Sequence, residues 1–170
     1  YAFATPSARA SARSMVRPHP IGYPFMPTAL IIEARFYEDI ANLLLEGAPA
    51  ELERRGFEIE TVQVPGVLEI PPALSMAMSS SRRRDFAFDA YVLLGCVIRG
   101  ETSHYDIVAG EGNRGVMELA VNSRLALGNG ILTTETMEQA QVRADPKRKN
   151  KGGDAAAAAV ALVELRNALS

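Results

Sequence analysis

His104 is the residue in this sequence that is best suited to acid-base chemistry. It follows an apolar run at residues 91–98 and a polar loop, RGETS, at residues 99–103, and a long helical pattern begins at His104 itself. The neutral imidazole of histidine has a pKa near neutral pH and transfers protons in both directions. The residues alone leave two interpretations, a catalytic proton shuttle or a helix-terminal histidine held by a backbone carbonyl.

The loop before His104 has the composition of a phosphate cradle. Gly100 lets backbone amides approach an anion, and Glu101 and Thr102 lead into a helix N-terminus with partial positive charge. Arg143 offers a planar guanidinium that matches phosphate oxygens, although it also fits a cation at the C-terminal end of its own helix. A glycine turn is a weak signal by itself, so the prediction of anion binding depends on such cations.

For three other side chains, a role in ligand binding competes with an ordinary structural role. Phe36 stands between a strand pattern and a helical pattern, where its ring either stacks on a flat heterocycle or packs in the core. Glu69 stands at a helix start, where a lone carboxylate often interacts with the helix dipole. Lys151 either meets a charged ligand or belongs, with the basic residues 147–149, to a solvated loop.

Four ordered segments carry the motifs of a known family. They read ARF at residues 34–36, VPGVLEIP at 64–71, GCVIRGETSHYD at 95–106 and GILTTETMEQA at 130–140, and NKG follows at 150–152. In this order they resemble the lumazine synthase family, whose members catalyse the penultimate step of riboflavin biosynthesis. Four motifs in one order are far more specific than any one of them.

The resemblance implies a reaction and the residues that perform it. The reaction is the condensation of 5-amino-6-(D-ribitylamino)uracil with 3,4-dihydroxy-2-butanone 4-phosphate to 6,7-dimethyl-8-ribityllumazine, phosphate and water, without a metal or an organic cofactor. By position, His104 moves protons and Arg143 binds the phosphate. Phe36 covers the pyrimidine ring, and Glu69 accepts hydrogen bonds from the ribityl hydroxyls. The remaining substrate-binding residues that the resemblance implies are Val67, Leu68, Cys96, Val97, Ile98, Gly100, Glu101, Thr102, Asn129 and Lys151.

The chain departs from the family pattern at three places. Asn129 stands where the family commonly has a phenylalanine that a neighbouring subunit stacks on the substrate ring, and asparagine offers only hydrogen bonds there. Tyr37 stands where asparagine is usual, and the 145–149 loop lacks the common glycines. Asn129 therefore motivates an alternative, a flavin- or lumazine-binding module without useful catalysis. A shell-forming structural subunit and a different phosphate-handling flavodoxin-like enzyme are two further alternatives.

The resemblance also implies an oligomer, a ring of five subunits with a site at each interface. There the edge with Phe36, Glu69 and His104 meets the Asn129 and Arg143 region of the next chain. We expect the free homopentamer rather than the icosahedral shell of sixty subunits, because a proline-rich entry and the glycine-poor loop can block the shell. Riboflavin synthase is a further expected partner, whereas nucleic acid and membranes are not expected.

The elements that position these residues follow from apolar periodicity. Strand patterns lie at residues 29–32, 57–64, 91–98 and 130–133, and helical patterns lie at 37–55, 69–79, 104–127, 136–143 and 153–169. This alternation predicts an α/β fold of three layers, αβα and flavodoxin-like, with a mainly parallel four-stranded sheet whose loops meet at one edge. Pro49 predicts a kink or a break in the first helix. The small residues 155–159 predict a last helix pressed onto the sheet or a neighbouring subunit.

Composition bounds the class of protein. A chain of 170 residues that is 48% apolar fits one domain, assigned to residues 27–170. The net charge of -2 gives no footprint for nucleic acid, and the run at 82–84 fits a solvated loop. One cysteine excludes an intrachain disulfide. Two histidines and one cysteine are too few for a common zinc site. No apolar run approaches the ~20 residues of a membrane span.

The first 26 residues differ in composition from the rest. They are rich in Ala, Ser, Arg and Pro and contain no acidic residue. We expect a flexible N-terminal extension on a cytoplasmic protein. A transit peptide for a plastid or another organelle has the same composition and is the alternative.

Overall fold

Four parallel strands form the centre of the molecule. The computed structural model describes residues 26–81 and 88–170, so residues 1–25 of the expected N-terminal extension and the run at 82–84 lie outside the described residues. The strands are β1 (Thr28–Ala34), β2 (Glu58–Val64), β3 (Ala90–Ile98) and β4 (Leu127–Thr134), and their order in the sheet is β2-β1-β3-β4. The helices are α1 (Glu38–Arg54), η1 (Val67–Glu69, a 3-10 turn), α2 (Ile70–Ser81), α3 (His104–Ser123), α4 (Met137–Ala144) and α5 (Lys151–Ala168).

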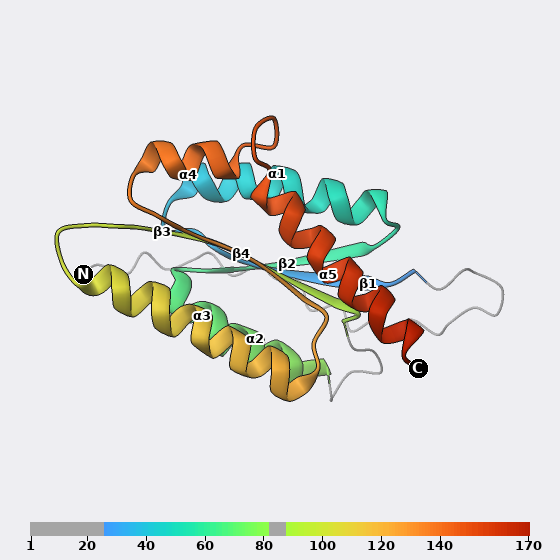
Figure 1. Ribbon diagram of the computed structural model, residues 1–170. Coiled ribbons are helices and arrows are strands. Elements are labelled where there is room, and N and C mark those ends of the chain that lie inside the picture. The colour runs from blue at the N-terminus through green and yellow to red at the C-terminus, as the bar shows by residue number, and fades with distance from the viewer. Residues whose placement is uncertain (1–25, 82–87) are drawn as a thin grey trace, which may run out of the picture.

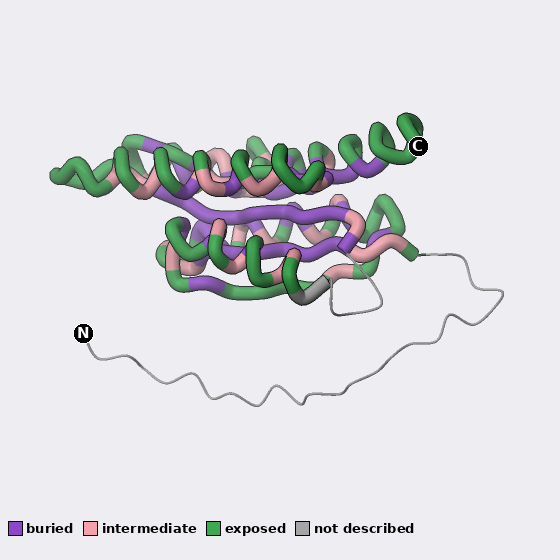
Figure 2. The backbone as a smooth tube through the Cα atoms, turned by 90° about the horizontal axis from the view of Figure 1, so that it is seen from below, coloured by how far each residue is buried: buried purple, intermediate pink, exposed green. Residues whose placement is uncertain are grey.

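Helices cover both faces of the sheet. The α1, α4 and α5 helices lie on one face, and α2 and α3 lie on the other (Figure 1). Alternate residues of β1 serve the two cores, with Ile31 facing the first and Leu30 and Ile32 facing the second. Figure 2 shows the buried segments between the two helical layers. The predicted three-layer α/β fold with a parallel four-stranded sheet is confirmed.

The last helix packs directly on the sheet, as its small residues predict. Ala155, Ala156 and Ala159 are buried against the sheet and α1. A Cβ atom at Gly128 in β4 would overlap the backbone carbonyl of Ala155, so the absence of a side chain at residue 128 is what permits this approach. None of the helices that the structure describes is long and apolar enough to cross a membrane.

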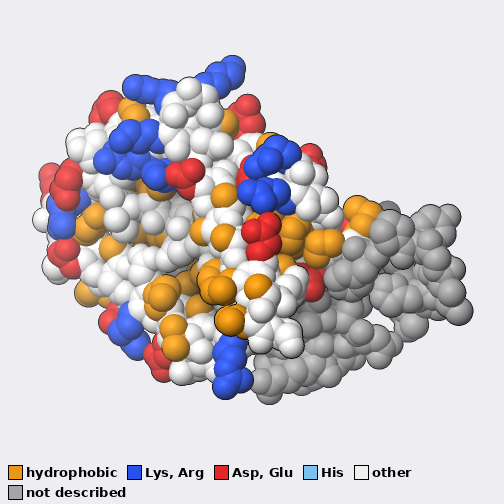
Figure 3. Space-filling model, turned by 45° about the vertical axis from the view of Figure 1, so that its right-hand side comes forward, with side chains coloured by type: hydrophobic (Ala, Val, Ile, Leu, Met, Phe, Trp, Pro, Cys, Tyr) orange, Lys and Arg blue, Asp and Glu red, His pale blue; other side chains and the backbone are white. Residues whose placement is uncertain are grey.

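Large apolar side chains remain on the surface of the single chain. Figure 3 turns one end of the molecule forward and shows apolar side chains gathered there among charged ones. On α3, Met117 and Val121 are 51% and 68% exposed, and on α5 Leu165 is 52% exposed. Where exposed apolar side chains gather into a contiguous patch, they commonly mark an interface with another molecule.

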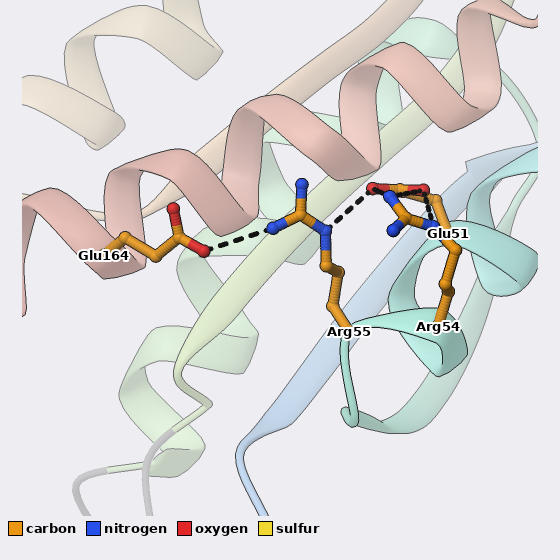
Figure 4. Close-up of polar contacts among 4 residues, drawn as sticks. All are labelled: Glu51, Arg54, Arg55 and Glu164. Carbon is orange, nitrogen blue, oxygen red and sulfur yellow. Dashed lines mark hydrogen bonds and ion pairs between the residues drawn. The ribbon is translucent and has the colours of Figure 1, made fainter.

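A chain of ion pairs joins α1 to α5 at the end of the sheet where the strands begin. Glu51 pairs with Arg54 and Arg55, and Arg55 reaches Glu164 of α5 at 3.2 Å (Figure 4). Hydrogen bonds from Arg54 and Arg55 lower the pKa of Glu51, with the contribution of Arg54 the larger. Buried apolar side chains pack the two helices together, and the exposed Arg55–Glu164 pair adds a polar link between them at this end of the molecule.

Two expected helix boundaries are corrected by the structure. Pro49 lies inside a continuous α1, so the predicted break into two helices is wrong. Burial of Leu44 and Leu52 on either side of it contributes about 1.5–3 kcal/mol each, which offsets the ~3 kcal/mol cost of an interior proline. The helix predicted over 104–127 ends at Ser123, because Arg124 adopts a left-handed conformation with φ 53° and β4 begins at Leu127.

Candidate active site

The C-terminal ends of the strands place the loops of interest side by side. The Arg35 backbone amide donates to the Val64 carbonyl at 3.0 Å, which joins the ends of β1 and β2. The Arg99 amide donates to the Thr134 carbonyl at 2.9 Å, which joins the ends of β3 and β4. The segments that follow each strand therefore emerge at a single edge, as parallel topology requires.

His104 is the first residue of α3, and its side chain is exposed. Its backbone amide donates to the Thr102 hydroxyl at 3.4 Å. No backbone carbonyl among the described residues accepts a hydrogen bond from the imidazole, so the structure does not support a histidine held by a carbonyl. Gly100, Glu101 and Thr102 are exposed in the loop before it. The helix N-terminus and an accessible imidazole thus occupy one surface.

Arg99 holds the loop before His104 in place. Its guanidinium pairs with Asp106 of α3 at 3.2 Å and with Glu135, after β4, at 2.9 Å. It also lies over the ring of Tyr105, 4.0 Å from the ring centroid. Hydrogen bonds to Asp106 and then Glu135 raise the pKa of Arg99. No sequence pattern indicates this role of Arg99, because its partner Glu135 belongs to a different loop.

Phe36 projects from the loop between β1 and α1. Its side chain is 72% exposed, so the core-packing interpretation is wrong. Its ring makes an edge contact with Tyr37, with centroids 5.0 Å apart and planes at 75°. Tyr37 packs partly against the core, and this burial raises its pKa, with a smaller contribution from Cys96. With this exposure, most of the Phe36 ring is accessible to a ligand.

A buried carboxylate that the sequence motifs do not single out lies just before this loop. Glu33 of β1 has no exposed surface and accepts hydrogen bonds from Arg35 and from Gln63 of β2. The second terminal nitrogen of Arg35 donates to Asn42 of α1 at 2.8 Å. The sequence signal that could have indicated this carboxylate is a charged residue directly after the apolar run 29–32.

The other predicted residues of this edge differ in exposure. Glu69 and Leu68 are exposed on η1, whereas Val67 is buried. On β3, Cys96 and Val97 are buried, and Ile98 is half-buried. Burial raises the pKa of the Cys96 thiol to about 11, against a smaller lowering by its hydrogen bond with Thr134. This strand offers a ligand mainly its backbone, since its side chains belong to the core.

Three predicted residues do not join this edge within one chain. Asn129 lies in the middle of β4, where it is opposite Leu93 of β3 in the register of the sheet. This position is five residues, or about 16 Å, before the end of the strand. Its side chain donates to Asn113 of α3 at 2.7 Å. Arg143 lies in the last turn of α4, on the opposite face of the sheet from α3, and donates to its own helix at the Gln139 carbonyl. Lys151 starts α5 and pairs with Asp154.

A cavity of about 290 Å³ lies at the other end of the sheet. Its walls include Pro27, Phe57 and Asp89, which precede β1, β2 and β3, and none of the predicted site residues lines it. At the edge with His104, residues 99–104 are exposed in the single chain.

Comparison with known proteins decides the family. The family model for 6,7-dimethyl-8-ribityllumazine synthase matches residues 27–167, a range that contains every predicted site residue. The chain belongs to this family. A protein of that name from Methylorubrum populi is 55% identical to it over 82% of the chain and 82% of its own length. One from Zymomonas mobilis is 51% identical over 85% of the chain and 100% of its own length. One from Methylocella silvestris is 56% identical over 78% of the chain and 81% of its length.

Lumazine synthase membership gives the two groups of residues a common context. The edge group, with Phe36, Glu69 and His104, is assembled by a single chain. The second group, with Asn129 and Arg143, lies elsewhere on the same chain and uses its polar atoms in local contacts. The family resemblance assigned the two groups to neighbouring chains, and the fold of one chain brings together the first group alone, as that expectation requires.

Proposed function

We propose that this chain acts as a lumazine synthase. It condenses 5-amino-6-(D-ribitylamino)uracil with 3,4-dihydroxy-2-butanone 4-phosphate to 6,7-dimethyl-8-ribityllumazine, with release of phosphate and water, in riboflavin biosynthesis. It is therefore a transferase. The observation that carries this proposal is the family match across residues 27–167, which spans the whole edge around the exposed His104.

The pyrimidine substrate binds along the loops after β1 and β2 in this proposal. The accessible ring of Phe36 stacks on the heterocycle, and the exposed carboxylate of Glu69 accepts hydrogen bonds from the ribityl hydroxyls. Backbone groups of residues 96–98 fix the ring edge, because the side chains of Cys96 and Val97 are buried. Val67 and Leu68 shape the floor beside Glu69.

The phosphate of the second substrate binds at the N-terminus of α3. The amides of Gly100, Glu101 and Thr102 lead into a helix of twenty residues, whose dipole favours an anion at this end. His104 lies at the same terminus and transfers protons while the amine condenses with the ketone and the phosphate leaves. Arg143 and Lys151 add positive charge from a second chain.

The separation of the two groups supports a shared site in an oligomer. A second copy brings Asn129, Arg143 and Lys151 to an edge that a single chain leaves open. Exposed apolar side chains on α3 and α5, Val121 and Leu165 among them, give a contact surface for this copy. The family resemblance sets the number at five, and we propose the free pentamer as the active unit. A mass near five times 18.3 kDa in solution supports it, and an active monomer would remove the shared site.

The direct test is product formation. Purified protein with both substrates should give the absorbance and fluorescence of the lumazine, without added metal or cofactor. Asn129 favours a second candidate, a binding module, because its amide is occupied by Asn113 and gives no stacking surface. Saturable lumazine binding without turnover would select that candidate. A cytoplasmic location and an association with riboflavin synthase are also proposed, and cell fractionation and co-purification test them.

A further inference from the structure

Glu33 is a charged residue at a fully buried position of the sheet. It lies on the central strand β1, between Gln63 of β2 and Leu94 of β3, and its side chain has no exposed surface. A buried carboxylate is stable only when it is paired and hydrogen-bonded. Glu33 therefore constrains the groups around it to remain where they are.

Arg35 is the cation that Glu33 holds. Its Nη1 atom lies 3.1 Å from Oε2 and 3.3 Å from Oε1 of Glu33. Its Nη2 atom donates to Asn42 Oδ1 at 2.8 Å, and its backbone amide donates to the Val64 carbonyl at 3.0 Å. The side chain of Arg35 thus links β1 with α1, and its backbone links the end of β1 to β2.

The segment between these anchors carries Phe36. Arg35 precedes it and is held by Glu33 and Asn42, and Tyr37 follows it and packs against the core. The ring of Phe36 itself is 72% exposed, with an edge contact to Tyr37. The direction of the ring is therefore set through its two neighbours rather than by packing of its own.

We infer that Glu33 is a positioning residue for substrate binding. Its carboxylate locks Arg35, and Arg35 fixes the β1–α1 loop in the conformation that presents the Phe36 ring to the pyrimidine. This inference rests on the proposed role of Phe36. Glu33 touches no substrate and acts only through Arg35.

The first experiment replaces Glu33 by an uncharged isostere. Glu33→Gln keeps the shape and removes the charge that holds Arg35. The Michaelis constant for the pyrimidine should rise about tenfold, because a misplaced binding group loses much of its contribution. The Michaelis constant for the butanone phosphate should change less than about twofold, since the α3 N-terminus keeps its own contacts. An equal rise for both substrates would mean general loosening and would overturn the inference.

A matched control uses the other partner of the same carboxylate. Gln63→Ala removes the 2.8 Å hydrogen bond to Glu33 but leaves the contact with Arg35. This variant should bind the pyrimidine as the wild type does. A tenfold loss in this variant would show that any disturbance of the carboxylate suffices, contrary to the inferred route through Arg35.

A double-mutant cycle separates this inference from the proposed function. Phe36→Ala should itself weaken pyrimidine binding, and Glu33→Gln should then add almost nothing, because no ring remains to be positioned. If the two effects multiply, Glu33 does not act through Phe36. If Phe36→Ala binds normally, the proposed stacking role fails, and the inferred positioning fails with it.

A second variant covers the case in which Glu33→Gln does not fold. Asn42→Ala breaks the α1 end of the link and leaves the buried ion pair intact. It should raise the Michaelis constant for the pyrimidine severalfold, again without an effect in the Phe36→Ala background. A wild-type constant in Asn42→Ala would contradict the link through Arg35.

Discussion

Arg99 and Glu135 form an ion pair that joins the loop after β3 to the loop after β4, with Nε of Arg99 2.9 Å from the carboxylate. Both side chains are partly exposed, so the pair contributes little to global stability. Its importance lies in where it acts, because the loop it holds leads directly into His104. Local order at this edge depends on contacts between loops as well as on the sheet beneath them.

Glu135→Gln should therefore separate stability from activity. The free energy of unfolding should fall by less than about 1 kcal/mol, as for other exposed ion pairs. Turnover should fall more clearly, by about two- to tenfold, because the loop before His104 gains freedom and positioning is a large part of catalysis. Urea unfolding and steady-state kinetics on the same preparation measure both. Unchanged turnover would leave Arg99 without a role in holding this loop for catalysis.

Removal of the imidazole should abolish most of the catalysis. His104→Ala should slow turnover by roughly 10²- to 10⁴-fold, the range for loss of a general acid-base. The side chain is exposed, so the melting temperature should stay close to that of the wild type. Rates of lumazine formation and thermal unfolding provide the two measurements. A variant that turns over near the wild-type rate would exclude His104 from proton transfer.

Arg143→Ala should affect one substrate far more than the other. Loss of a charge-assisted contact with phosphate is worth about 1.5–3 kcal/mol, or roughly ten- to a hundredfold in the Michaelis constant for the butanone phosphate. The constant for the pyrimidine should be nearly unchanged. Lys147→Ala in the neighbouring loop is a control for a general loss of positive charge. Equal weakening towards both substrates would assign Arg143 a structural role.

The buried thiol makes stability depend on alkaline pH. Burial raises the pKa of Cys96 from its ordinary value of 9.0 to about 11. Between these values the unfolded chain releases the thiol proton and the folded chain retains it, so folded stability decreases as pH rises. The stability advantage of the wild type over Cys96→Ala should be full below pH 9 and smaller near pH 11. Urea unfolding at pH 8 and pH 10.5 tests this, and a constant difference would contradict it.

The sequence predicted the edge well because its signals are local. Each strand is an apolar run, each run ends in a polar loop, and parallel topology then brings Phe36 and His104 to one edge. The exposure of the two side chains was not predictable in the same way. Phe36 fitted a core position equally well, and only the fold shows that the core is already filled by Tyr37 and its neighbours.

The contacts that hold the edge were beyond the reach of sequence patterns. Gln63 lies 30 residues from Glu33, and Glu135 lies 36 residues from Arg99. No periodicity links such pairs, since they meet only after the sheet has formed. Pro49 was misjudged for a related reason, because the burial of Leu44 and Leu52 depends on α1 packing against distant elements.

Because Ala155 lies so close to Gly128, the positions of β4 differ in how well they tolerate a larger side chain. On the face towards α5, residues 128 and 130 have no room for a side chain, and Leu132 is buried. On the other face, residues 129 and 133 are exposed, and Asn129 is held there only by polar contacts with Asn113 and Ile131. A substitution at residue 129 therefore costs hydrogen bonds, whereas one at residue 128 or 130 forces α5 away from the sheet. The strand thus combines positions that the packing of α5 closes to any side chain with a position where the side chain can change and α5 can stay in place.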